Sequence, residues 1–341
     1  MKNIILKKCM LLVLILIVGC SSDNEEQAPA TLPNITTNII SNLNENSAIS
    51  GGVILSDGGS NIIAKGIVWN TQSNPTINLN TKTIDGSGNS NFSSTLFNLQ
   101  KGTTYYVRSY ATNAIGTVYG NEITFLTPDI SSNAVYIHKF DNTGQDLSGN
   151  NFNATLNSAV SYTSNRNNNS LKSLNFSNTG FPMVSFPNSF GSFEQQMTNN
   201  SFTFCFWFNH SYDNVPNDNN IFFKGGSWKE GGVKLNSNKN IIFHQINKPT
   251  ITTNTVFNKD QWYFISIVYD GGSDTLKIFI NGQQDISQTY VGFNFSTVIN
   301  TPAAGAGVYL GDNFYGKIDN FMLFARALSS YDLDYIKNNI D

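Results

Sequence analysis

The pattern that most limits what this chain can fold into is a series of short runs of alternating apolar and polar residues, with almost no helical pattern before residue 329. Alternation with a period of two is typical of strands buried on one face. Residues 64–70 and 104–113 are clear examples, and clusters of Gly, Asn, Asp and Pro separate such runs. Short strands at this spacing predict antiparallel sandwiches, so the expected fold class is all-β.

Length and composition set the number of domains. The chain has 341 residues, of which 40% are hydrophobic and 13% charged. This length suits two domains, and this much apolar material can build real cores, which argues against a disordered chain. The formal net charge of −3 gives no basis for expecting a nucleic-acid partner, because that would need a clustered basic surface.

The N-terminal segment has the features of an export signal. Lysines near the start precede an apolar run at residues 10–18, which suits a signal-peptide core and is too short to span a bilayer. The run ends in Ile17-Val18-Gly19-Cys20, which resembles the lipobox of bacterial lipoproteins. The resemblance implies that residues 1–19 are a lipoprotein signal peptide and that Cys20 carries the lipid as a thioether. The alternative is an ordinary signal peptide with a chance cysteine.

Residues 20–31 are interpreted as the lipidated cysteine followed by a flexible acidic tether. The cluster at residues 23–26 resembles the surface-export signal of lipoproteins in some Gram-negative, glycan-feeding bacteria. This implies an outer-membrane protein that is lipid-anchored and faces the cell exterior, although a plain solvated tether is the alternative reading. One acyl chain binds a membrane only marginally, whereas the two or three chains of such lipoproteins imply a permanent membrane partner.

The first domain is expected at residues 32–128. Residues 99–108, followed by Tyr110-Ala111-Thr112-Asn113, resemble the second half of a fibronectin type III domain. The resemblance implies a β-sandwich that acts as a spacer, with a tyrosine-corner hydrogen bond from Tyr105. Trp69 is expected in the core rather than at a sugar site. Lys65 and Arg108, on alternating strands, are expected to face solvent.

Residues 129–134 are the expected linker, and residues 135–341 the second domain. The run 202–208 is apolar on both faces, as in the central strands of a large two-sheet jelly roll. Asn281-Gly282 directly after a strand pattern predicts a tight turn. Ser329 is expected to cap one short helix, with Asp332 at its third position.

Several motifs of the second domain occur in a familiar order. They include Phe140-Asp141, Trp262-Tyr263-Phe264 and residues 316–320. Together they resemble the laminin G-like, concanavalin A-like lectin fold of bacterial proteins. Many members bind one structural Ca²⁺, and by position this implies Asp141 and Asp319 as ligands, with backbone carbonyls completing the shell. The family often has two consecutive aspartates at the second place, whereas here Asn320 follows. Alternatively, both aspartates merely accept hydrogen bonds in turns.

Hydrolases of the same fold carry Glu-x-Asp-x-x-Glu on one strand, because cleavage needs two facing carboxylates about 5–5.5 Å or 6.5–9.5 Å apart. No such motif occurs here, and the only glutamates after residue 135 are Glu194 and Glu230. No catalytic residue is therefore predicted, and the protein is expected not to be an enzyme. Cys205 lies among large apolar residues and is expected to be a buried, inert thiol.

A glycan-binding surface needs exposed aromatic rings beside amides and carboxylates. Loop segments with this chemistry point to Tyr212, Asp213, Trp228 and Tyr315, with Trp228 as the strongest single candidate. The alternative is that these are ordinary polar loops. The sequence therefore predicts a surface lipoprotein that binds a polysaccharide or glycan. The second interpretation is an adhesion or scaffold protein that binds another protein, and the least favoured is a glycoside hydrolase.

Overall fold

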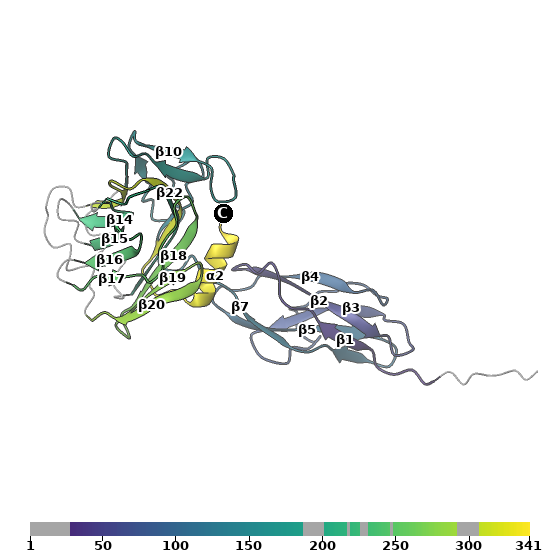
Figure 1. Cartoon of the computed structure of the whole chain (residues 1–341). Helices are drawn as coiled ribbons and strands as arrows, with labels where there is room; N and C mark the ends of the chain where they lie inside the picture. Colours follow the sequence, from purple (N-terminus) through teal and green to yellow (C-terminus); the bar gives the residue numbers. More distant parts are fainter. Residues whose placement is uncertain (1–27, 187–200, 217–218, 226–230, 246–247, 292–306) are drawn as a thin grey trace, which may run out of the picture. The chain divides into compact units, whose positions relative to one another are not determined.

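The computed structural model describes residues 28–186, 201–216, 219–225, 231–245, 248–291 and 307–341 (Figure 1). Their contacts divide the chain into two compact units. The first contains Ile49–Leu96 and Tyr106–Thr124 together with the residues up to Ser41. The second contains Asn42–Ala48, Phe97–Tyr105 and Phe125–Asp341. Almost all of the regular structure is β-strand, which confirms the all-β prediction.

The N-terminal strands form two small antiparallel sheets. One has the order β1-β2-β4, and in the other β3, β5 and β6 are neighbours while β7 pairs with β5. Ile67, Val68 and Trp69 of β3 are buried, so the prediction that Trp69 belongs to the core is confirmed. The strands are β1 (Asn34–Thr37), β2 (Ser47–Ser56), β3 (Ala64–Asn70), β4 (Phe92–Phe97), β5 (Thr104–Thr112), β6 (Thr117–Tyr119) and β7 (Ile123–Leu126).

Two side chains of this part test the sequence predictions with opposite results. The hydroxyl of Tyr105 accepts a hydrogen bond of 2.9 Å from the backbone N–H of Gln100, so the predicted tyrosine-corner bond is confirmed. Lys65 was expected to face solvent, and this is wrong, because its side chain is 2% exposed. Its ammonium donates to the carbonyls of Gly88 and Ser90 at 3.0 and 2.6 Å, and these bonds compensate for its burial.

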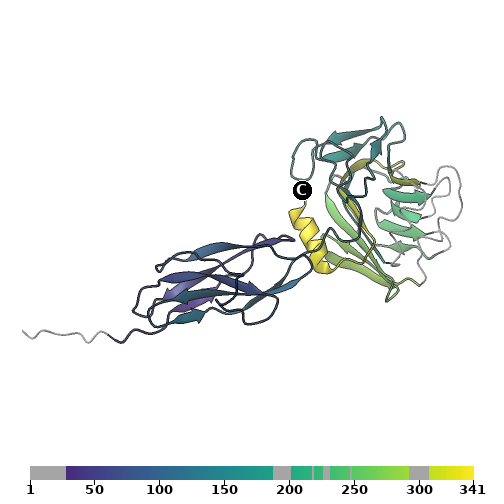
Figure 2. The same ribbon diagram turned by 180° about the vertical axis from the view of Figure 1, so that it is seen from behind.

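The C-terminal strands form two larger antiparallel sheets. Among the described residues, one sheet has the order β10-β11-β22-β13-β18-β19-β20, with β8 also on β22, and the other runs β17-β16-β15-β14-β21-β12-β9. Figures 1 and 2 show these sheets as two layers. Their strands are β8 (Ala134–His138), β9 (Thr155–Leu156), β10 (Val160–Thr163), β11 (Ser173–Phe176), β12 (Met183–Phe186), β13 (Phe202–His210), β14 (Phe222–Gly225), β15 (Gly231–Leu235), β16 (Ile241–Gln245), β17 (Ile251–Thr252), β18 (Tyr263–Asp270), β19 (Thr275–Ile280), β20 (Gln283–Thr289), β21 (Gly307–Gly311) and β22 (Gly316–Phe324).

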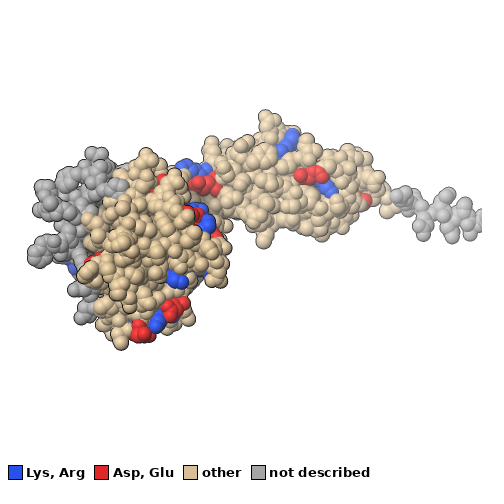
Figure 3. All heavy atoms as spheres, turned by 90° about the horizontal axis from the view of Figure 1, so that it is seen from above, with Lys and Arg blue, Asp and Glu red and all other residues tan. Residues whose placement is uncertain are grey.

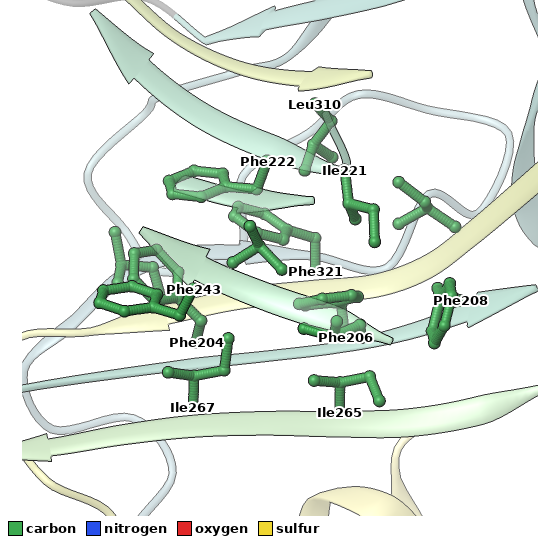
Figure 4. Close-up of a cluster of buried hydrophobic side chains, with 14 of the residues drawn as sticks. Phe204, Phe206, Phe208, Ile221, Phe222, Phe243, Ile265, Ile267, Leu310 and Phe321 are labelled. Atoms are coloured by element: carbon green, nitrogen blue, oxygen red, sulfur yellow. The ribbon is translucent and has the colours of Figure 1, made fainter. Parts of the chain in front are cut away.

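Strand β13 is apolar on both faces because both of its faces are covered. Phe204, Phe206 and Phe208 enter the core between the two sheets, as Figure 4 shows. Cys205 belongs to a separate cluster with Leu333 of the C-terminal helix α2 (Ser330–Asn339). The expected burial of Cys205 is confirmed, and burial raises the pKa of its thiol to about 12, which disfavours the reactive thiolate.

The ends of local elements follow the expected chemistry. Helix α2 starts with a capping box, in which the Ser329 side chain accepts from the Asp332 backbone and the Asp332 side chain accepts from the Ser329 backbone. Asn281 and Gly282 join β19 to β20 with φ of 52° and 85°, as a tight hairpin turn requires. Among the described residues, the chain forms no helix with the length and apolar character needed to cross a bilayer.

Charged side chains are sparse on the part of the described surface that Figure 3 shows. On the described part of the face in Figure 3, basic and acidic residues occur in small mixed groups rather than in a broad area of one sign.

Candidate functional site

Two of the predicted site residues meet at one pocket of the second unit. Tyr212, just after β13, and Tyr315, just before β22, line a pocket of about 300 Å³. Residues 177–182, between β11 and β12, also line it. We call this the aromatic pocket. Its lining residues are Ser177, Asn178, Thr179, Gly180, Phe181, Pro182, Tyr212, Pro216, Asn313 and Tyr315.

The hydroxyl of Tyr212 holds the loop that carries Tyr315. It accepts a hydrogen bond of 2.8 Å from the backbone N–H of Tyr315 and donates to the carbonyl of Asn313. The two tyrosine rings meet edge to face with centroids 5.9 Å apart. Burial raises the pKa of Tyr212 to about 12, which keeps the hydroxyl protonated so that it can donate and accept at once. Tyr212 is therefore a buried residue that supports the pocket wall, whereas Tyr315 is partly exposed to solvent.

Phe181 supplies an exposed aromatic ring at the mouth of the pocket. Its side chain is 76% exposed although it is a large apolar group. Its backbone has φ of 52°, in the left-handed region that bulky residues rarely occupy, and the Asn157 amide donates to its carbonyl at 2.7 Å. The pocket lining thus includes a solvent-exposed apolar ring whose backbone conformation bulky residues rarely adopt.

The other two predicted site residues do not join this pocket. Asp213 follows Tyr212 directly, but its side chain is 83% exposed, pairs with Lys259 at 2.8 Å and does not line the pocket. The structure thus places Asp213 in a surface ion pair beside the site. Trp228, the strongest candidate from the sequence, lies outside the described residues, as do Cys20 and both glutamates of the second domain.

The two predicted metal ligands are each paired with a cation. Asp319 accepts from Arg166 at 2.8 Å, and Asp141 pairs with Lys172 at 2.9 Å. Burial raises the pKa of Asp319 to about 7; the Arg166 guanidinium opposes this rise, and the nearby Asp141 carboxylate adds to it. The structure therefore brings these two acidic groups within electrostatic range of each other.

The chemistry of these residues suits a hard cation. The second carboxylate oxygen of Asp141 and of Asp319 is buried and, within the described chain, has no hydrogen-bond partner. The amide oxygen of Asn320 is also buried and, within the described chain, has no hydrogen-bond partner. Calcium coordinates six to eight oxygens of this type. No group of three or more His, Cys, Asp and Glu with metal-site geometry occurs in the described residues, so backbone or water oxygens would have to complete the shell.

Sequence reasoning missed Phe181 and the arginine that binds Asp319. Phe181 follows a Gly and precedes a Pro, and this local pattern indicates a loop but not an exposed ring. Arg166 lies in an Asn-rich hairpin connection, where an arginine is ordinarily solvated. Both roles arise from neighbours distant in the chain, and so only the fold could identify them.

Comparison with known proteins identifies the class of the second domain. Residues 183–333, from β12 into helix α2, match the family model described as "Concanavalin A-like lectin/glucanases superfamily". The second unit therefore contains a concanavalin A-like lectin/glucanase domain with a jelly-roll fold. A search of curated protein sequences finds no match to the chain.

Solved structures show more distant likenesses. The binding domain of Paraclostridial Mosquitocidal Protein 1 matches with a TM-score of 0.47 and 15% identity, over 62% of this chain and 53% of that one. Domain 4 of the arabinanase AbnA from Geobacillus stearothermophilus, in complex with arabinotriose, matches with a TM-score of 0.43 and 18% identity, over 60% of this chain and 98% of that one. The binding domain of botulinum neurotoxin DC, in complex with rat synaptotagmin II, matches with a TM-score of 0.47 and 19% identity, over 62% of this chain and 53% of that one. The chain thus spans about half the length of the first and third. Similarity at this level says nothing about what this chain binds.

Proposed function

We propose that this protein binds carbohydrate through the aromatic pocket of its lectin-like domain, without cleaving it. The first, fibronectin type III-like sandwich then acts as a spacer, and a lipid on Cys20 anchors the chain in the outer membrane, facing the cell exterior. The observation that carries the proposal is the pocket itself, in which the exposed ring of Phe181 and the partly exposed ring of Tyr315 stand beside small polar side chains.

The pocket has the parts that sugar recognition needs. Phe181 and Tyr315 offer apolar ring surface, onto which the C–H face of a sugar can pack. Asn178, Thr179 and Asn313 add amide and hydroxyl groups at the same opening, which can exchange hydrogen bonds with sugar hydroxyls. The Tyr212 hydroxyl fixes the loop that carries Tyr315, so ligand binding would lose little conformational entropy in that loop.

A binding assay with single variants tests this site. The chain from residue 21 onward is incubated with insoluble glucan, mannan, galactan and xylan, and the bound fraction is measured. At least one polysaccharide should retain the protein, and Tyr315→Ala or Phe181→Ala should weaken retention about fivefold to thirtyfold, since each removes a ring worth about 1–2 kcal/mol.

The control and the contrary outcome use the same assay. Asp213→Ala removes an exposed charge next to the site that does not line the pocket, so it should leave retention unchanged. Retention that survives both aromatic substitutions would reject the pocket. Failure to bind any of the four polysaccharides would count against carbohydrate binding and favour the adhesion interpretation. Release of reducing ends would show hydrolysis.

The anchor is tested in the host cell. Cys20→Ser removes the only thiol at the lipobox position, so the chain should lose incorporation of labelled fatty acid and leave the membrane fraction. Surface exposure is tested by protease treatment of intact cells. A wild-type chain that carries no fatty acid would reject the anchor and leave the pocket proposal intact.

One structural Ca²⁺ is proposed at Asp141, Asp319 and Asn320. The support is their buried oxygens, which have no partner in the described chain. A bound Ca²⁺ would compensate for the burial of these oxygens and cross-link the segment after β8 to β22. Without the ion, Asp141 pairs with Lys172 and Asp319 pairs with Arg166.

A further inference from the structure

A second hollow lies on the lectin-like domain and shares no lining residue with the aromatic pocket. Its volume is about 570 Å³, within the range of ~300–1,000 Å³ typical of small-ligand sites. It is framed by the β10–β11 connection, by Trp207 of β13, by Trp262 just before β18, by Asn281 of the β19–β20 turn and by the last turn of α2. We call it the indole hollow.

One wall of the indole hollow is held rigidly. The guanidinium of Arg166 lies over the Trp207 ring at 4.5 Å from its centroid. Arg166 is fixed there by Asp319 at 2.8 Å and by the carbonyl of Ile340 at 2.6 Å, and its side chain is only 11% exposed. Trp207 also packs against Phe264. This wall therefore needs no rearrangement to receive a ligand.

The opposite side presents polar groups that are free to bind. In the described residues, neither the Trp262 indole N–H nor the Asn338 amide makes a hydrogen bond, and Asn338 is exposed. Asn281 uses its amide oxygen to accept from the Phe264 backbone at 2.9 Å, which fixes the orientation of the amide and leaves its NH₂ available. An indole and two amides that line one hollow are groups suited to binding a polyhydroxylated ring.

The charges at the hollow are already neutralised. Arg166 pairs with Asp319, and the Lys337 ammonium pairs with Asp334 at 2.9 Å and donates to the Asn281 carbonyl at 3.2 Å. Each cation therefore already has a carboxylate partner, so a ligand need not supply one. An anionic ligand would have to compete with these carboxylates, whereas a neutral one leaves each pair intact.

We propose that the indole hollow is a second carbohydrate-binding site, which takes a neutral sugar ring against Trp262 with Asn281 and Asn338 as hydrogen-bond partners. It extends the proposed carbohydrate binding to a separate place on the domain and does not require the aromatic pocket. Two sites on one domain would let a single polysaccharide chain be held with avidity beyond either site alone, provided that the chain can reach both.

Indole NMR signals test the proposal site by site. The chain contains four tryptophans, so ¹⁵N labelling yields four indole N–H signals, and Trp262→Phe assigns the relevant one. The purified protein is titrated with cello-, malto-, manno-, galacto- and xylo-trisaccharides and with trigalacturonate. At least one neutral trisaccharide should shift the Trp262 signal saturably, and Asn338→Ala should weaken that response at least threefold.

The matched variant separates the two sites. Tyr315→Ala removes a ring of the aromatic pocket, and the Trp262 response should persist in it with unchanged midpoint. A Trp262 signal that no neutral trisaccharide shifts, or that only trigalacturonate shifts, would overturn the proposal. So would a response that disappears in Tyr315→Ala. Because Asn338 is exposed and its amide makes no hydrogen bond in the described chain, Asn338→Ala should fold like the wild type, and a weaker midpoint for any sugar-induced change in the four indole signals would still support the proposal.

Discussion

The hydroxyl of Tyr212 accepts a 2.8 Å hydrogen bond from the backbone N–H of Tyr315, 103 residues further along the chain. The same hydroxyl donates to the carbonyl of Asn313, so one phenol oxygen ties two peptide groups of a single loop to the end of β13. This relationship turns two aromatic residues of unrelated loops into one wall of the aromatic pocket. It also divides their roles, because Tyr212 holds the loop and Tyr315 faces the opening.

The first prediction concerns that hydroxyl. Tyr212→Phe keeps the ring but removes two partly buried hydrogen bonds, one to the Asn313 carbonyl and one from the Tyr315 N–H, so the free energy of unfolding should fall by about 1–2 kcal/mol. Urea denaturation measures it. The hydroxyl of Tyr315 makes no hydrogen bond in the described chain, so Tyr315→Phe is the matched control and should change stability by less than about 0.5 kcal/mol. Equal effects of both substitutions would contradict this division of roles.

The second prediction concerns pH. Burial lowers the pKa of His138 from 6.5 to about 4, although the Asp146 carboxylate opposes the shift. The unfolded chain therefore binds a proton between these values that the folded chain does not, and folding loses stability as pH falls from 6.5 to 4. Burial raises the pKa of Asp319 from 3.8 to about 7. Here the folded chain binds the extra proton, so folding loses stability as pH rises from 3.8 to 7.

Two variants separate these opposite contributions. Relative to the wild type, His138→Phe should gain stability as pH falls from 6.5 to 4, and Asp319→Asn should gain stability as pH rises from 3.8 to 7. Urea denaturation at several pH values, with chelator present, measures both differences. A constant difference between variant and wild type across its window would show that the residue does not titrate as its burial requires.

The third prediction concerns calcium. At a hundredfold excess over its Kd, Ca²⁺ should stabilise the wild-type fold by about 2.7 kcal/mol, and chelator should reverse this. Asp141→Asn and Asp319→Asn should each reduce the effect strongly, because each removes a charged oxygen ligand. Asp334→Asn, which removes an exposed acid on α2, is the control. Thermal unfolding that responds neither to excess calcium nor to chelator would reject the site.

The fourth prediction concerns Lys65, whose ammonium donates to the Gly88 and Ser90 carbonyls in the first sandwich. Lys65→Met keeps the apolar stem but leaves these acceptors unpaired, so local stability should fall by about 1–3 kcal/mol. Hydrogen exchange of strand β3 in the full chain measures it. Lys101→Met, at a side chain 45% exposed, should have almost no effect. Unchanged exchange in Lys65→Met would mean that this burial is not stabilising.

The sequence by itself determined the strand-rich class, because period-two alternation and the length of apolar runs are local properties. It also determined the capping box at Ser329, the Asn281-Gly282 turn and the burial of Cys205, since each depends on neighbours within a few positions or on a strongly apolar segment. The doubly apolar run at residues 202–208 even indicated that β13 is covered on both faces.

Only the tertiary structure decided which polar and aromatic groups meet. Lys65 alternates as an exposed residue would, yet carbonyls more than twenty positions away enclose its ammonium. Phe181 and Tyr315 share a pocket because β12 and β22 both begin beside it. Arg166 faces Asp319 across 153 positions. Such pairings depend on which strands become neighbours, and that follows from the packing of the whole sandwich rather than from any local pattern.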